Sequence, residues 1–167
     1  MRRIDSALRS SYQRGFTLIE ILVVLLIIGI TLGFTLLAFG DFGEKRSIVV
    51  AAEQFTNYVK LAQQEAILEN ITLGIRLDKT RYQVLRFQKK TGWSAMPMNS
   101  VFHPQLFPKG LIPHLITTKS GDSLILFNST GDMTPFTLTF SSTKNVLIAT
   151  IIGKQNGTMH LDIEKSP

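Results

Sequence analysis

The chain of 167 residues begins with a polar stretch that is followed by a long apolar run. Glu20 is the only ionisable side chain between Phe16 and Phe39, and the 19 residues from Ile21 to Phe39 contain none. This length approaches the ~20 residues that a helix needs to cross the hydrocarbon core of a membrane. A core helix that is apolar on every face would need a much larger domain around it. The pattern therefore predicts a transmembrane helix over residues 16–39.

After residue 40, apolar residues recur at steps of three and four, which predicts an amphipathic helix over residues 40–70. The expected buried stripe is Ile48, Ala51, Ala52, Phe55, Tyr58, Val59, Ala62 and Ala66. The opposite face carries Glu53, Asn57, Lys60, Gln64 and Glu65. Asp41–Glu44 is expected to break or kink the helix. One helix from Phe16 to about Glu69 would be roughly 80 Å long, and its second half needs a sheet to cover the apolar stripe.

Short runs of alternating apolar and polar residues predict a β-rich domain over residues 71–167. Ile71–Leu77 and Tyr82–Phe87 are expected to form a hairpin around a turn at residues 78–80. Further strands are expected at about residues 114–118, 124–127, 136–141, 146–152 and 158–163. Residues 96–113 contain four prolines and are expected to form a long loop. Seven short strands predict an antiparallel β-sandwich or two packed sheets, so the expected fold class is α+β.

Composition excludes several classes of protein. The chain is 44% hydrophobic and 18% charged, which is not the composition of a disordered chain. It has no cysteine, which excludes disulfides, thiolate metal sites and a thiol nucleophile. The acids Asp122, Asp132, Asp162 and Glu164 do not form the dense cluster that calcium requires. No hydrolase, P-loop or dinucleotide motif occurs, and the three histidines are scattered. We therefore expect neither an enzyme nor a cofactor or metal.

Half of the net charge of +6 lies in the short amino-terminal segment. The first 15 residues carry four arginines against Asp5, a side-chain sum of +3. A basic segment before an apolar span is retained in the cytoplasm by the positive-inside rule. The sequence therefore predicts a single-pass protein with a cytoplasmic amino terminus and its carboxy-terminal domain across the membrane.

The junction between the polar and apolar segments reads Gly15-Phe16-Thr17-Leu18-Ile19-Glu20. A cleaved secretory signal fits poorly, because the apolar core is long and no small-residue cut site follows it closely. A plain signal anchor fits the length but leaves the preceding sequence unexplained. The string GFTLIE followed by an unbroken apolar run resembles the type III signal of type IV pilins and type II secretion pseudopilins. Gly15 has no side chain, so its backbone can be approached closely in a protease cleft.

This resemblance implies that a prepilin peptidase cleaves between Gly15 and Phe16 and methylates the new amino terminus of Phe16. Residues 1–15 would then be a removable leader peptide. It also implies that Glu20 pairs with the Phe16 amine of a neighbouring subunit during assembly. The alternative is that Glu20, only about one turn from Phe16, extends to the lipid head groups. The pair Gly29 and Gly33 has a spacing that favours close packing of membrane helices, although glycine is frequent in such helices generally.

Beyond the span, the resemblance narrows to minor pseudopilin H of type II secretion, the GspH/FimT-like family. It rests on LAQQEAILEN followed by the strand ITLGIRL, on Trp93 after a glycine turn, on ILFNSTGDMTP, and on a glycine in a final hairpin. The implied fold is type IV pilin-like, with a long hydrophobic helix packed on an antiparallel β-sandwich. The implied role is a structural subunit of the periplasmic pseudopilus, at or near its tip, in a bacterium with an inner membrane.

The partners implied by the resemblance are the major and minor pseudopilins, the prepilin peptidase and the inner-membrane secretion platform. Secreted substrates and the outer-membrane secretin are further expected contacts, and a nucleic acid is not expected. A different function remains open for the predicted hairpin, whose basic residues are Arg76, Lys79, Arg81, Arg86, Lys89 and Lys90. With Tyr82, Phe87 and Trp93 nearby, they could hold a DNA backbone and stack bases.

That alternative corresponds to a FimT-like minor type IV pilin that acts in pilus assembly or DNA uptake. The same basic residues are more typical of a solvated strand face, or of a patch attracted to anionic lipid head groups, than of a DNA site. A DNA-binding measurement distinguishes the DNA-uptake function from the pseudopilin function. Only the DNA-uptake function requires that the protein retains DNA and that this retention falls as salt is raised.

Overall fold

A computed structural model describes residues 16–97, 100–118 and 123–164. The chain divides into two compact units, Met1–Gly40 and Asp41–Pro167, which we describe separately. One helix, α1 (Leu18–Leu68), contributes to both units, and nine strands follow it in the described residues. The helix continues through Asp41–Glu44, so the break predicted there is wrong. That segment contains no proline, and glycine costs a helix only about 1 kcal/mol per residue.

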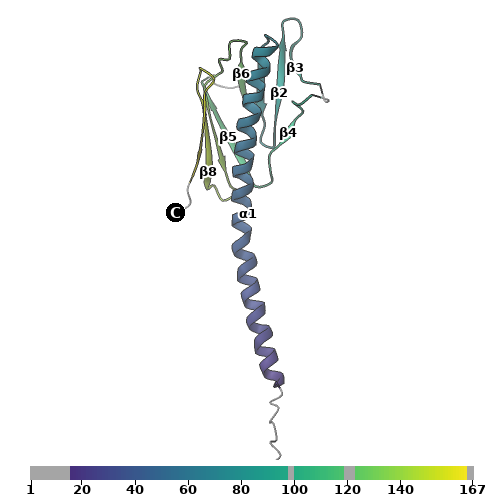
Figure 1. Ribbon diagram of the computed structural model, residues 1–167, viewed down its shortest axis with the longest axis vertical. Coiled ribbons are helices and arrows are strands. Elements are labelled where there is room, and N and C mark those ends of the chain that lie inside the picture. The colour runs from purple at the N-terminus through teal and green to yellow at the C-terminus, as the bar shows by residue number, and fades with distance from the viewer. Residues whose placement is uncertain (1–15, 98–99, 119–122, 165–167) are drawn as a thin grey trace, which may run out of the picture. The chain divides into compact units, whose positions relative to one another are not determined.

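In the second unit, the strands form two antiparallel sheets (Figure 1). The first sheet has the order β3-β2-β1-β6, and β4 also pairs with β2. Its strands are β1 (Leu73–Leu77), β2 (Arg81–Gln88), β3 (Gly92–Ala95), β4 (Gln105–Leu106) and β6 (Leu124–Phe127). The second sheet has the order β5-β7-β8-β9. Its strands are β5 (Ile112–Thr117), β7 (Phe136–Ser141), β8 (Leu147–Gly153) and β9 (Met159–Ile163).

The predicted hairpin is confirmed, since β1 and β2 pair with Ile75 opposite Val84. The other five predicted strands are also present, as β5 to β9. Two strands, β3 and β4, were not predicted. β4 lies inside the segment that was predicted to be a loop. The predicted strand β5 is present but begins earlier than expected, at Ile112. β3 and β4 are four and two residues long, which is too short for an alternating pattern to identify them.

The hydrophobic core lies between α1 and the inner faces of both sheets. All residues of the predicted apolar stripe are buried, which confirms the amphipathic interpretation of the second half of α1. Phe55 joins the three layers, because its ring contacts Tyr82 of β2 at a centroid distance of 5.0 Å and Phe140 of β7 at 6.2 Å. Tyr58, one turn further along the helix, packs edge-on against Tyr82 as well.

Two turns close around the carboxy-terminal part of α1. The side-chain amide of Gln63 donates a hydrogen bond of 2.6 Å to the carbonyl oxygen of Gly131. Gly157, in the turn between β8 and β9, has a φ of +81°. A Cβ at Gly157 would lie 2.6 Å from the Gly131 oxygen and would collide with the Gln63 amide. The glycine in the final hairpin is therefore required both by its backbone conformation and by the close approach of the helix.

Candidate assembly site and interaction surface

The first turn of α1 is capped by a threonine. The backbone N–H of Glu20 donates to the Thr17 hydroxyl at 3.2 Å and to the Thr17 carbonyl oxygen at 3.1 Å. Thr17 and Glu20 thus have the spacing of a capping box, in which the two residues satisfy the free donors of the helix start. An acid in the first turn is also favoured by the helix dipole. The role of Thr17 was not predicted from the sequence, although the Thr-x-x-Glu spacing is the signal for it.

Phe16 comes just before α1, and Glu20 lies in the first turn of α1. Phe16 is 77% exposed and Glu20 is exposed, so neither side chain is used in packing within the described part of the chain. Gly15, the other residue of the predicted cleavage site, lies outside the described residues. What the geometry offers at this end is an accessible carboxylate beside the start of the predicted mature chain.

The segment Leu18–Thr35 has a mean hydropathy of 2.6, and none of it is buried. Among the described residues, it is the one helical segment long and apolar enough to span a membrane. Its hydroxyl groups are satisfied inside the helix. Thr31 donates to the Ile27 carbonyl at 2.9 Å, and Thr35 donates to the Thr31 carbonyl at 2.8 Å. This back-bonding removes free donors that would be costly in lipid.

Gly29 and Gly33 also lie in this segment, one turn apart and therefore on one face of the helix. A Cβ added to either glycine would meet no atom within 4 Å. The described structure therefore gives no reason within the chain for these two glycines. A small-residue strip of this kind is what allows a second helix to approach closely.

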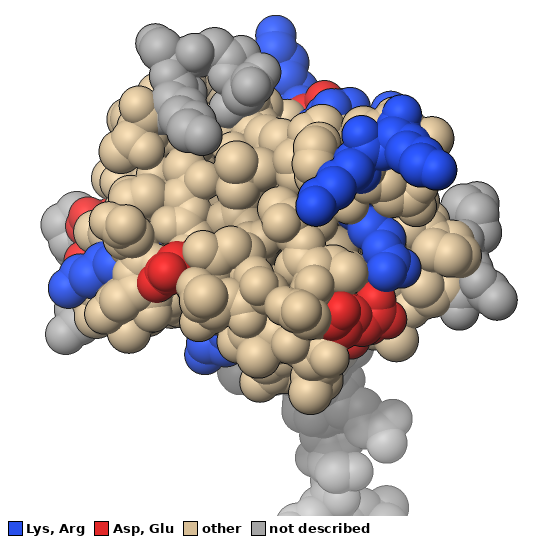
Figure 2. Space-filling model, turned by 90° about the horizontal axis from the view of Figure 1, so that it is seen from above, with Lys and Arg blue, Asp and Glu red and all other residues tan. Residues whose placement is uncertain are grey.

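The six basic residues of the predicted DNA surface do not lie together. Lys79 and Arg81 are at one end of the β1–β2 hairpin, and Lys89 and Lys90 are at the other end, in the turn after β2. Lys89 comes eight positions after Arg81 along the strand, which corresponds to about 26 Å. Figure 2, seen from above, shows one group of Lys and Arg side chains with acidic side chains near it, and further Lys and Arg side chains at other edges of the molecule.

Two of these cations have acidic partners. Arg81 contacts Asp78 at 3.2 Å, and Arg86 contacts Glu69 of α1 at 3.4 Å. Glu65 lies beside Glu69, and its pKa is raised by desolvation, by a hydrogen bond with Glu69 and by the charge of Glu69, while Arg86 lowers it. The arginines at these two places are therefore partly neutralised, and the six residues do not make a continuous cationic track.

In the described part of the chain, no group of three or more His, Asp or Glu side chains could hold a metal ion. The pKa of Tyr58 is raised to about 12, mainly because the phenol is buried. Its hydroxyl donates to the His103 carbonyl at 3.3 Å, and its ring belongs to the aromatic core. Burial likewise raises the pKa of Tyr82. Both perturbed phenols are explained by packing of α1 on the first sheet.

Comparison with known proteins decides the family. The family model described as "Type II transport protein GspH" matches residues 51–157. The chain belongs to the GspH family. A second model, the prokaryotic N-terminal methylation motif, matches residues 10–36. That range contains Gly15, Phe16 and Glu20, so the two resemblances noted in the sequence are both confirmed at the level of the family.

Curated relatives carry the same family name. "Type II secretion system protein H" of Pseudomonas aeruginosa is 32% identical over 121 residues, which cover 72% of this chain and 67% of the relative. The protein of that name from Escherichia coli is 29% identical over 135 residues, which cover 75% of this chain and 79% of the relative. These matches cover most of this chain and most of each relative.

Solved structures confirm the pilin-like α+β fold. The minor pseudopilin EpsH of Vibrio cholerae superposes with a TM-score of 0.61 at 22% identity, covering 70% of this chain and 97% of EpsH. The type IV minor pilin FimU of Pseudomonas aeruginosa superposes with a TM-score of 0.55 at 19% identity, covering 72% of this chain and 92% of FimU. Because both a pseudopilin and a pilin share the fold, the fold alone does not separate the two systems; the curated relatives above are named for type II secretion.

Proposed function

We propose that this GspH family member is a minor pseudopilin, a structural subunit of the periplasmic pseudopilus that supports protein export across the outer membrane. The observation that carries the proposal is the match of the GspH family model to residues 51–157, preceded by the methylation motif over residues 10–36. Its position is at or near the tip, where it helps to initiate assembly. Such a role uses shape and surface, and it requires no catalytic residue.

The proposed topology follows from the charge and hydropathy of the amino-terminal segment. Residues 1–15 are a cytoplasmic leader, residues 16–39 cross the inner membrane, and the remainder lies in the periplasm. This division is supported by the basic leader and by the exposed apolar segment Leu18–Thr35. The prepilin peptidase removes the leader between Gly15 and Phe16 and methylates Phe16.

Assembly is proposed to depend on a charge pair between subunits. Cleavage creates an ammonium group on Phe16, and the exposed carboxylate of Glu20 on a neighbouring subunit can pair with it. At ~4 Å and an effective dielectric constant of ~20, such a pair gains ~4 kcal/mol of Coulomb energy before desolvation. The open strip at Gly29 and Gly33 would let the helices of adjacent subunits approach closely. Together these contacts would fix the axial register of the helices.

The proposed partners follow from these steps. The prepilin peptidase acts on the leader, the inner-membrane platform receives the processed subunit, and other major and minor pseudopilins pack against it. Secreted substrates and the outer-membrane secretin are proposed contacts of the assembled periplasmic domain.

The pilus and DNA-uptake alternative is less well supported. It requires the basic hairpin to act as one surface, whereas Arg81 and Arg86 are engaged by Asp78 and Glu69. A filter-binding titration of the protein with DNA at two salt concentrations separates the alternatives. Salt-dependent retention of DNA would support the uptake function, and no retention would remove it.

The assembly proposal is tested with Glu20→Val in cells that carry the secretion system. We expect the leader to be removed normally and in-cell photo-cross-linking to other pseudopilins to fall strongly, because the ammonium group of the neighbour loses its counter-charge. The matched control is Glu53→Val, which removes an exposed carboxylate from the periplasmic half of α1. Normal cross-linking of the Glu20 variant would overturn the proposed pair.

A further inference from the structure

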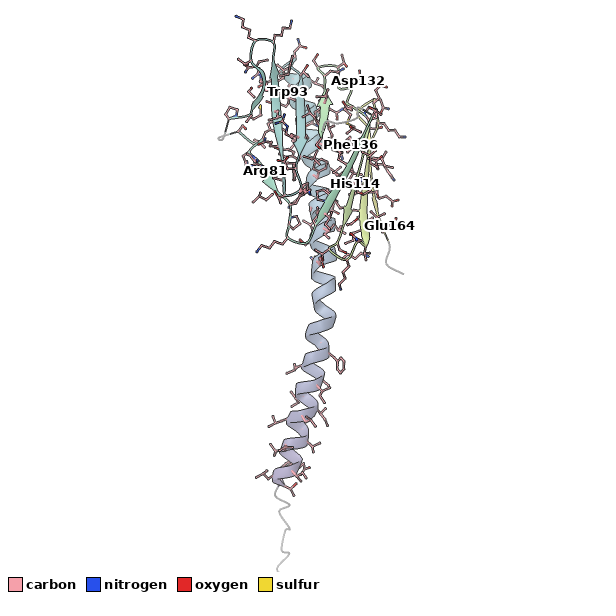
Figure 3. All side chains as sticks on the ribbon, turned by 180° about the vertical axis from the view of Figure 1, so that it is seen from behind. Arg81, Trp93, His114, Asp132, Phe136 and Glu164 are labelled. Atoms are coloured by element: carbon pink, nitrogen blue, oxygen red, sulfur yellow. The ribbon has the colours of Figure 1, made fainter. Side chains whose placement is uncertain are left out.

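The first sheet carries an aromatic pair on the face turned away from α1. Leu73 and Ile75 point into the core, so the intervening Gly74 faces outward. A Cβ at Gly74 would lie 3.0 Å from Cζ3 of Trp93, so the Trp93 ring reaches across β2 and covers this glycine. Phe87, directly opposite Trp93 on β2, has its ring centroid 5.2 Å from that of Trp93. Figure 3 labels Trp93 on this sheet, with Arg81 at the other end.

This outward face is more apolar than a solvated sheet face requires. Leu85 lies opposite Gly74 and is only 3% exposed, although it points away from the helix. Leu124 of β6 also packs toward Gly74, at 3.1 Å from the position of its added Cβ. Phe87 remains 44% exposed. A sheet that faces water on one side normally alternates apolar and polar residues. The exposed Phe87 beside the apolar Leu85 and Leu124 therefore marks a contact surface.

Cations flank the aromatic pair on both sides. Arg76 and Trp93 line a hollow of about 200 Å³ together with Asp78. Asp78 is held by Arg81, and no ion pair of Arg76 with a described residue is found. Beyond Phe87, Lys89 and Lys90 are exposed in the turn to β3. The strands β1, β2, β3 and β6 contain three arginines and no acidic residue.

We propose that this aromatic–basic face, formed by Arg76, Phe87, Lys89, Lys90 and Trp93, docks an acidic segment of a partner protein. An apolar side chain of that segment packs on Phe87 and Trp93, and a neighbouring carboxylate pairs with Arg76, while Asp78 stays engaged with Arg81. The charge of the face selects the occupant, because a basic or neutral segment would leave the cations on both flanks without a counter-charge. Tryptophan and arginine are also the residues most enriched at the energetic centres of protein interfaces.

The same surface fits a protein better than a nucleic acid. Phosphates follow one another along a strand and need a row of unengaged cations. Here Arg76 and the pair Lys89 and Lys90 lie on opposite sides of the aromatic pair, whereas Arg86 lies on the helix-facing side of the sheet and contacts Glu69. The cations of this face therefore do not form the row that a continuous phosphate backbone needs, whereas a protein segment can put single carboxylates next to apolar side chains.

Trp93 is the only tryptophan of the chain, so its fluorescence reports on this face alone. The full chain in neutral detergent is titrated with a synthetic peptide that is rich in Glu, contains a few Phe and lacks Trp. We expect a saturable change in Trp93 emission that weakens as salt is raised. A peptide with Lys in place of Glu should give no saturable change.

Two variants test the proposed contacts. Arg76→Gln and Phe87→Ser should each weaken peptide binding by about tenfold, the effect expected for loss of a central interface contact. Lys60→Gln, which removes an exposed cation from α1, should bind like the parent chain. Circular dichroism checks that the variants are folded. The proposal is overturned if the acidic peptide does not bind saturably, if Arg76→Gln leaves its affinity unchanged, or if single-stranded DNA or anionic vesicles displace it at lower concentration.

Discussion

Two glycines of this protein are required for different reasons, one for its backbone conformation and one also for the space around it. Substituting each glycine by alanine distinguishes these reasons. Gly92 and Gly157 both have a positive φ, of +75° and +81°. A Cβ at Gly92 would meet no atom within 4 Å, whereas one at Gly157 would meet Gln63 and the Gly131 carbonyl. The first position therefore requires glycine for its backbone alone, and the second for its backbone and its surroundings.

We therefore predict that Gly157→Ala destabilises the periplasmic domain more than Gly92→Ala. The Gly92 variant should lose about 1 kcal/mol from backbone strain, and the Gly157 variant should lose more because α1 must also move away. Urea unfolding followed by circular dichroism measures both. Equal losses for the two variants would mean that Gln63 and Gly131 give way without cost.

Tyr58 predicts a dependence of stability on pH. Burial raises the pKa of its phenol from 10.0 to about 12, so the folded state disfavours the ionised form. The resulting stability is fully present below pH 10.0, the ordinary pKa, and is lost as pH rises through 12. At pH 7, Tyr58→Phe should cost only ~1 kcal/mol, for the hydrogen bond to His103.

In strong alkali, the difference between Tyr58→Phe and the parent chain should shrink by roughly 1–2 kcal/mol, because phenylalanine does not ionise. Urea unfolding at neutral and alkaline pH measures this change. Comparison with the parent chain cancels the titration of lysines and of Tyr82, which both proteins share. A difference that stays constant with pH would contradict the assignment of the shift to burial of Tyr58.

The residues of the candidate site could be predicted only where their signal is local. Phe16 and Glu20 are predicted as site residues because one contiguous string, GFTLIE, contains them. The contact between Trp93 and Gly74 was not found, because it depends on the pairing of three strands. The capping role of Thr17 is also a local signal, because it depends only on the three-residue spacing to Glu20.

At the scale of elements, α1 was predicted well because its periodicity extends over many turns. Every residue of the expected apolar stripe is buried. The strands with clear alternation were found as well, whereas β3 and β4 depend on their pairing with β2 and have little pattern of their own. The break expected in α1 shows the limit of turn-forming residues as signals, since Asp41–Glu44 remains helical.

The aromatic contacts of Phe55 make a prediction at this scale. Because Phe55 packs against Tyr82 of the first sheet and Phe140 of the second, Phe55→Ala should destabilise the domain by about 3–5 kcal/mol. Phe55→Leu should cost less, since it leaves a smaller cavity. Asn57→Ala, on the exposed face of the same helix, should change stability by less than about 0.5 kcal/mol.

Thermal or urea unfolding of the three variants measures these differences. If Phe55→Ala cost no more than Asn57→Ala, the two sheets would not be joined through this ring.

At the scale of the whole molecule, the charge of the leader predicts orientation in the membrane. Replacing Arg2, Arg3, Arg9 and Arg14 by Gln removes the positive charge that retains the leader in the cytoplasm. We expect fewer correctly oriented chains, measured as a loss of activity of a periplasmic reporter enzyme fused to the carboxy terminus. Replacing the basic hairpin residues Lys89 and Lys90 by Gln should leave reporter activity unchanged. An unchanged reporter after loss of all four leader arginines would contradict the predicted topology.

The central claim concerns the start of the mature chain, where a new ammonium group on Phe16 meets the carboxylate of a neighbouring Glu20. Mass spectrometry of the amino-terminal peptide, from membranes of cells with an active prepilin peptidase, tests it most directly. The account predicts a chain that begins with N-methylated Phe16. A mature chain that still carries residues 1–15 would contradict it.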